Sequence, residues 1–279
     1  MAKRKRIQNI EKMIKEGYGK GMGSNYKPWI KIQDVPYLGR VTRVKGMKTV
    51  RQHDLLSDME RNYFYILEYC DDAADIREQY PLLPIDETIS IANELGIEYP
   101  KNPATNENVV MTTDFLITIS NSEVTKEVAR TIKSKDDLLN RRILEKFDIE
   151  RVFWKRRGIN WAIVTEEEIN KTIAHNISFI HGYKDITNVD SFKQIEILEI
   201  KDLIYEFLKR IVDDERSMRD ICSEFDSDMN LEKGSGVSIF KYLIINKIIK
   251  VNILEKININ KKIEILCIEK EQMKKVEAI

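Results

Sequence analysis

Two residues in the middle of the chain could together hydrolyse a phosphodiester bond. Asp114 stands at the start of the apolar run MTTDFLITI, and Lys133 ends the run EVARTIK, nineteen residues later. That separation leaves room for two strands and a tight turn such as SNSEV. Because antiparallel pairing places the start of one strand beside the end of the next, a carboxylate and an ammonium group could meet at one edge of a sheet.

Hydrolysis of a phosphodiester at neutral pH requires a divalent cation, an activated water and positive charge to offset the charge that develops on the phosphate. Mg²⁺ suits such a site, because it binds one or two carboxylates and keeps several of its waters. Glu60 could supply the second carboxylate, since it lies in the first turn of a helix that Ser57 or Asp58 would cap. The alternatives are that Asp114 is a strand-end residue accepting backbone hydrogen bonds and that Lys133 is an ordinary solvated lysine.

The pattern around these residues predicts an α/β fold, with a mixed sheet flanked by helices. Periodicity and turn residues predict helices over about 6–16, 57–67, 86–97 and 138–158, and strands over 73–84, 113–120, 127–133 and 159–165. The run 113–120 is almost continuously apolar, which indicates a strand covered on both faces. The four glycines between residues 17 and 23 follow no predicted strand, so they indicate a connector rather than a phosphate-binding loop.

The character of the chain changes after about residue 170, which predicts two domains, 1–170 and 171–279. The second would contain three helices, over about 191–211, 215–225 and 230–246, and then a hairpin formed by IIKVNILE and KKIEILCIEK. This order is typical of a winged helix-turn-helix, a fold that binds either DNA or protein. The stretch VDDERSMRDICSEFDSDMN is acidic and would repel a phosphate backbone, so we expect this winged-helix domain to dock on protein.

The 46 basic and 46 acidic residues balance, so any site for a polyanion must be a local patch. Five cations gather in one short segment, and we predict that they contact DNA phosphates; the alternative is a solvated loop. They are Arg40, Arg43, Lys45, Lys48 and Arg51.

The remaining chemistry-bearing residues favour structural roles in a cytoplasmic protein. The three cysteines are far apart, as in reduced proteins, and no apolar run approaches the roughly 20 residues that a membrane span needs. The histidines lack zinc-ligand spacing, and His53 could touch DNA or a metal-bound water but is more commonly structural. Trp29, Trp154 and Trp161 sit in apolar patterns typical of core anchors.

Six runs of the first domain occur in an order that is not expected from composition. Within residues 7–165 they read IKEGYGKG, PWIKIQDVP, HDLLSDMERNYFYILEY, DIREQYPLLP, MTTDFLITI and LEKFDIERVFW. These runs resemble the TnsA endonuclease subunit of heteromeric cut-and-paste transposases. Beyond residue 170 the likeness is weaker, although that family also ends in a winged-helix domain.

The resemblance implies a site on a restriction-endonuclease-like domain. Glu60, Asp114 and Lys133 would be its acid-acid-lysine set, with Mg²⁺ as the metal and Mn²⁺ able to replace it. The two acids would hold the metal, and the lysine would orient or help deprotonate the water.

Two further positions bear on the metal ligands. Restriction-like sites usually have Glu or Gln two positions before the lysine, where this chain has Thr131, so the backbone carbonyl of Ile132 is the substitute ligand that we consider. Glu150 matches a family acid that could lie near a second metal ion. The alternative is that Glu150, like Glu145 and Asp148 on the same predicted helix, belongs to a solvated face.

The resemblance also implies a metal-dependent DNA endonuclease that cuts the 5′ ends of a transposon, on the bacterial nucleoid during transposition. A TnsB-like partner transposase would cut the 3′ ends, and a TnsC-like ATPase regulator would dock on the second domain, with the tail 261–279 as the contact segment. Two alternatives are a catalytically idle module that bridges DNA and these proteins, and a winged-helix transcription regulator.

Overall fold

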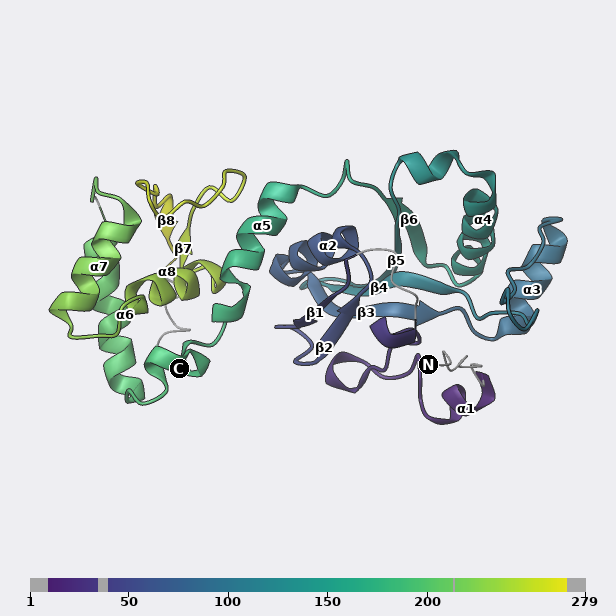
Figure 1. Ribbon diagram of the computed structural model, residues 1–279, viewed down its shortest axis with the longest axis horizontal. Helices are drawn as coiled ribbons and strands as arrows, with labels where there is room; N and C mark the ends of the chain where they lie inside the picture. The colour runs from purple at the N-terminus through teal and green to yellow at the C-terminus, as the bar shows by residue number, and fades with distance from the viewer. Residues whose placement is uncertain (1–9, 35–39, 213, 270–279) are drawn as a thin grey trace, which may run out of the picture. The chain divides into compact units, whose positions relative to one another are not determined.

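The computed structural model describes residues 10–34, 40–212 and 214–269. The chain forms two compact units, Met1–Asn170 and Lys171–Ile279 (Figure 1). Between residues 10 and 269, outside the two gaps, no helix is long and apolar enough to cross a membrane. Residues 6–9 of the first predicted helix and 270–279 of the proposed docking tail lie outside the described residues.

The first unit is built on a mixed sheet with the order β3-β4-β5-β6. Strands β3 (Ala73–Pro81), β4 (Thr112–Ser120) and β5 (Thr125–Ile132) pair antiparallel, whereas β6 (Asn160–Val164) runs parallel to β5. A parallel neighbour requires a long crossover, and helix α4 (Arg141–Arg156) supplies it between β5 and β6. The predicted mixed sheet is therefore confirmed.

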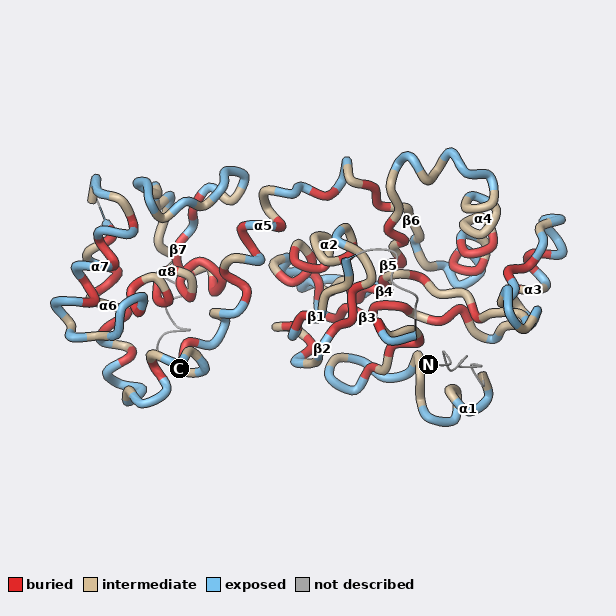
Figure 2. The backbone as a smooth tube through the Cα atoms, in the orientation of Figure 1, coloured by how far each residue is buried: buried red, intermediate tan, exposed pale blue. Residues whose placement is uncertain are grey.

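Helices cover both faces of this sheet. Leu116 and Ala129 share a buried cluster with residues of α3 (Ile85–Glu94) and α4 on one face. On the other face, Tyr63 of α2 (Asp58–Tyr69) packs on Phe115, with 5.8 Å between ring centroids. Phe115, Leu116 and Ile117 are all at most 1% exposed, because neighbouring residues of a strand alternate between two covered faces. Strands β3 and β4 are accordingly buried along most of their length (Figure 2).

Shorter elements surround the sheet. Helix α1 (Ile10–Lys15) is followed by the glycine-rich connector, in which a Cβ atom on Gly19 would lie 2.2 Å from Pro81 Cγ at the end of β3. A two-stranded hairpin, β1 (Thr42–Lys45) and β2 (Gln52–Leu55), packs beside β3. Single turns of 3₁₀ helix occur at Gly23–Asn25, Ile32–Asp34, Asp136–Leu139, His181–Tyr183, Ile186–Asn188 and Asp190–Phe192.

The second unit is helical and ends in a small strand pair. Its helices are α5 (Lys171–Ile180), α6 (Ile197–Ile211), α7 (Met218–Asp228) and α8 (Ser235–Ile245), and β7 (Ile249–Lys250) pairs antiparallel with β8 (Cys267–Ile268). Phe207 of α6 and Phe225 of α7 meet edge to face at 5.1 Å in the core. Nine of the eleven residues of α8 are buried, so this helix is the centre of the unit.

Several boundaries in the second unit differ from the prediction. The helix expected from residue 191 begins at Ile197, because Glu196 has an extended backbone with ψ of 147°. The helix expected from residue 230 begins at Ser235, because Gly234 before it has a left-handed backbone with φ of 98°. The long strands expected of the hairpin are only two residues each. Asn252 ends the pairing after β7, because its side chain accepts a hydrogen bond from the Leu254 N–H at 3.1 Å and forms a turn.

Candidate active site

A cavity of about 390 Å³ in the first unit brings the predicted site residues together. Glu60 reaches it from α2, Asp114 from β4, Ile132 and Lys133 from the end of β5, and Glu150 from α4. Residues that lie 90 positions apart in the sequence therefore line one space.

Glu60 is fixed by the start of its helix. Ser57 caps α2 by accepting the Glu60 N–H at 3.1 Å, and it donates its hydroxyl to Glu60 Oε1 at 3.0 Å. This reciprocal arrangement is a variant of the capping box, in which Glu60 reaches back to the Leu56 N–H, 3.0 Å from Oε2, instead of the N–H of the capping residue. Burial raises the pKa of Glu60 to about 8, and the nearby charge of Asp114 adds to the rise.

Asp114 lies where β4 and β5 separate. The pairing of these strands ends at Phe115 and Arg130, and one residue earlier the Asp114 side chain takes over as acceptor for the Ile132 N–H, with Oδ2 at 2.7 Å. Its Oδ1 accepts from Gln79 Nε2 at 3.2 Å. Burial raises the pKa of Asp114 to about 6, although these two hydrogen bonds act in the opposite direction. Asp114 thus accepts a backbone hydrogen bond, as expected of a strand-end residue without a catalytic role, and it also lines the cavity.

Lys133 follows directly after β5, and both its backbone and its side chain have partners. Its backbone N–H donates to the carbonyl of Val164 at 3.0 Å, which extends the pairing with β6. Its ammonium group lies 3.2 Å from Asp137 Oδ2, and its charge lowers the pKa of Asp114. The lysine is therefore near the acid pair, with a carboxylate partner that sequence reasoning did not consider.

Glu150 is 2% exposed, so the alternative of a solvated helical face is wrong for this residue. Its Oε1 accepts hydrogen bonds from Thr113 Oγ1 at 2.6 Å and from Thr131 Oγ1 at 2.5 Å. Burial raises the pKa of Glu150 to about 7, and the charge of Asp114 contributes in the same direction. The Thr131 hydroxyl also accepts from Trp161 Nε1 at 3.0 Å, so it supports Glu150 rather than occupying the ligand position two residues before Lys133.

The donor set suits a hard cation. Glu60 is buried and Asp114 half-buried, and desolvation raises the pKa of both carboxyl groups, as expected for acids withdrawn from water. Wherever the structure gives positions, no three His, Cys, Asp or Glu side chains gather into a metal-ligand cluster. Two carboxylates fit Mg²⁺, which completes its coordination with waters, and do not fit a structural zinc site.

The predicted DNA-contact segment is divided by the structure. The prediction that Arg51 contacts DNA is wrong. Its side chain points inward and donates to Glu78 Oε1 at 2.6 Å and to the Ile76 carbonyl at 2.8 Å. Arg43 lies 3.3 Å from Asp54, and Lys48 donates to the Cys70 carbonyl at 2.7 Å. Arg40 and Lys45 are exposed. Only part of this segment is therefore placed to meet phosphates.

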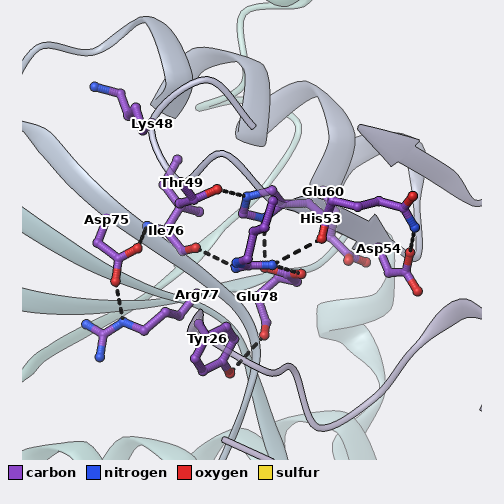
Figure 3. Close-up of polar contacts among 12 residues, drawn as sticks. Tyr26, Lys48, Thr49, His53, Asp54, Glu60, Asp75, Ile76, Arg77 and Glu78 are labelled. Carbon is purple, nitrogen blue, oxygen red and sulfur yellow. Dashed lines mark hydrogen bonds and ion pairs between the residues drawn. The ribbon is translucent and has the colours of Figure 1, made fainter. Parts of the chain in front are cut away.

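His53 belongs to a buried network that fastens the β1–β2 hairpin to β3 (Figure 3). The ring is fully buried, with Nδ1 at 2.8 Å from Glu78 Oε2 and Nε2 at 2.6 Å from Thr49 Oγ1. Burial alone would raise the pKa of Glu78, but hydrogen bonds from Arg51 and His53, with their charges, lower it to about 2. The structural role predicted for His53 is confirmed, as are the core positions of Trp29 and Trp154.

Two residues near the site were missed from the sequence. Lys146 lines the cavity one helical turn before Glu150, and burial followed by the charges of Arg142 and Lys133 lowers its pKa. The spacing of four between Lys146 and Glu150 would have placed both on one helical face. Gln79, which bonds Asp114, gave no signal, because a backbone bend within a strand cannot be recognised from one sequence.

Comparisons with known proteins cover both units. A family model described as TnsA-like endonuclease N terminal matches residues 70–166, and one described as TnsA endonuclease C terminal matches residues 168–253. The transposon Tn7 transposition protein TnsA of Escherichia coli is 35% identical to the chain over 243 residues, which are 87% of this chain and 85% of that protein.

Proposed function

The chain belongs to the TnsA family of transposition endonucleases, and from this premise we propose that it uses Mg²⁺ to hydrolyse phosphodiester bonds at the 5′ ends of a transposon. The observation that carries the proposal is the cavity in which Glu60, Asp114 and Lys133 meet. Burial of two acids beside a lysine is unfavourable for stability and is typical of catalytic sites.

The side chains divide the reaction between them. Glu60 and Asp114, with the Ile132 carbonyl, would hold the metal, which polarises the phosphate and makes a bound water more acidic; Mn²⁺ would be accepted by the same oxygen donors. Lys133 would orient the water and offset the charge that develops on the phosphate. Lys146, which also lines the cavity, would add positive charge toward the DNA backbone.

Glu150 fits a supporting role better than that of a ligand to a second metal. Its Oε1 is engaged by two threonine hydroxyls, and its raised pKa means that the proton is bound more tightly than in solution. A neutral Glu150 would keep Thr113 and Thr131 in place beneath the acid pair. The alternative role for Glu150 is that of a ligand to a second metal ion.

The two units would follow the family in fold and in partners. The mixed sheet with an acid pair at a point of strand separation supports a restriction-endonuclease-like domain, and three helices followed by a strand pair support a winged helix. The name of the Escherichia coli relative, a transposition protein, supports action within a transposition machinery. We place a TnsB-like transposase at the 3′ ends and a TnsC-like ATPase regulator on the second unit. Leu198, 72% exposed on α6, and the acidic residues of α7 favour protein as its partner.

Strand-specific cleavage of transposon ends by the reconstituted complex tests this function. Wild-type chain with Mg²⁺ should nick the 5′ ends, and Asp114→Asn, which keeps an acceptor for the Ile132 N–H, should not. Lys12→Met, at an exposed site far from the cavity in sequence, serves as a matched control. Equal nicking by Asp114→Asn would leave the idle assembly module as the better interpretation.

A further inference from the structure

Gln79 occupies an unusual position in the central sheet. It lies in β3, between the paired residues Glu78 and Tyr80, which face Phe115 and Thr113 of β4. Its φ is +48°, the left-handed region that residues other than glycine rarely adopt, and the regular register skips it. The bend turns the Gln79 side chain toward Asp114, the residue of β4 that lies between Phe115 and Thr113.

Both ends of the Gln79 amide are held. Its Nε2 donates to Asp114 Oδ1 at 3.2 Å, and its Oε1 accepts from Thr112 Oγ1 at 3.1 Å. Because the residue is 3% exposed, water does not compete for these bonds. Because an ionised carboxylate only accepts hydrogen bonds, Asp114 selects the amide orientation in which the NH₂ group faces it, and the Thr112 hydroxyl then donates to Oε1.

We infer that Gln79 is a positioning residue of the proposed cleavage centre, whose carboxamide holds the carboxylate of Asp114 in the orientation that receives the metal. This inference rests on the proposed function. It adds a residue that touches neither the metal nor the DNA but fixes the geometry of a carboxylate that would touch the metal.

The chemistry of the side chain explains why an amide is suited to this position. Its NH₂ group donates to Asp114 Oδ1, and each oxygen of that carboxylate has a second lone pair left for a cation. A third carboxylate would add repulsion between acids, and a lysine would compete with the metal for them. A neutral donor orients Asp114 and leaves the negative charge that attracts the metal unchanged.

Calorimetric titration of the full chain with Mn²⁺ tests this role without relying on cleavage. Gln79→Met keeps the length of the side chain and removes the amide, whereas Gln79→Gly removes the amide and also accepts the positive φ without strain. Both should weaken Mn²⁺ binding about 10- to 100-fold, the usual effect of losing a group that orients a metal ligand. Gln52→Met, the same change at an exposed position of β2, should bind like the wild type.

The glycine variant separates positioning from backbone geometry. If Gln79 mattered only for the bend in β3, Gln79→Gly would fold well and bind Mn²⁺ with wild-type affinity, and that result would overturn the inference. Thr112→Val, which removes only the hydrogen bond to Oε1, should give a smaller loss and covers the case in which the Gln79 variants fail to fold. Equal binding by wild type and Thr112→Val would then count against the inference.

The same titration distinguishes this inference from the proposed function. Absence of Mn²⁺ binding by the wild type, or equal binding by Asp114→Asn, would show that the metal site itself is wrong, and the role of Gln79 would fall with it. Binding that depends on Asp114 but not on Gln79 would overturn the role of Gln79 alone.

Discussion

Replacing Glu150 with glutamine should remove a pH-dependent loss of stability from the first unit. Glutamine has nearly the same shape and keeps an oxygen that can accept from Thr113 and Thr131. It has no charge to bury at any pH. The variant therefore isolates the free energy of placing this carboxylate in the core.

The magnitude follows from the pKa of Glu150, which burial raises from 4.5 to about 7. Since the folded protein binds this proton more tightly than the unfolded chain, the stability that it contributes is complete below about pH 4.5 and falls as the pH rises to about 7. A difference of one in pKa corresponds to about 1.4 kcal/mol, so the full loss is about 3 kcal/mol. The free energy of unfolding of Glu150→Gln should lack this fall.

Urea unfolding followed by tryptophan fluorescence measures the free energy of unfolding of the first unit, which contains Glu150. All three tryptophans, Trp29, Trp154 and Trp161, belong to the first unit. Measured in a chelator at about pH 4.5 and about pH 8, the difference in unfolding free energy between variant and wild type should change by about 3 kcal/mol in favour of the variant. Glu60 and Asp114 titrate in both proteins, so their main contributions cancel. A difference that stays constant with pH would refute this account of Glu150.

Four further predictions concern residues with contrasting environments. Lys133→Ala should lose 5′-end cleavage yet bind Mn²⁺ in calorimetry, because its ammonium group is not a ligand; loss of binding with the fold intact would contradict this role. Arg51→Met should lower the free energy of unfolding by about 3–5 kcal/mol in urea titrations, because the buried Glu78 would lose its arginine and keep only His53 as a partner; a surface-like effect of under 1 kcal/mol would show that the pair is not needed. Replacing the exposed Arg40 and Lys45 with methionine should flatten the salt dependence of DNA affinity by about two, and an unchanged slope would indicate a solvated loop. Residues 171–279 alone should retain the ATPase regulator or partner transposase in pull-downs, and mobility-shift assays showing specific DNA binding without either protein would reverse the assignment.

Local sequence patterns were sufficient for the strands and helices of the central sheet and for part of the site, but not for the β1–β2 hairpin, which no predicted strand covered. The apolar runs around Asp114 and Lys133 identified two paired strands, and the long helix before residue 158 is what makes β6 parallel. The capping pattern at Ser57 placed Glu60 at a helix start. Each of these features depends on residues close together in the chain.

Features that depend on distant partners could not be predicted. Arg51 looked like a surface cation because Glu78, which draws it inward, lies 27 positions away. Glu150 looked solvated because its partners, Thr113 and Thr131, come from two strands whose register was unknown. The contact of Gln79 with Asp114 depends on the positive φ of Gln79, which the hydrophobic periodicity of the sequence does not indicate.

The distribution of the site along the chain has a consequence for biosynthesis. Glu60 lies in α2, whereas the backbone of Lys133 is fixed by a hydrogen bond to Val164 in β6. A ribosome that has released only part of the first unit therefore presents α2 and β4 without the strand that fixes the backbone of Lys133. Non-local pairing of this kind forms late in folding. We therefore expect a nascent or truncated chain that ends before β6 not to cut the chromosome of the cell that makes it.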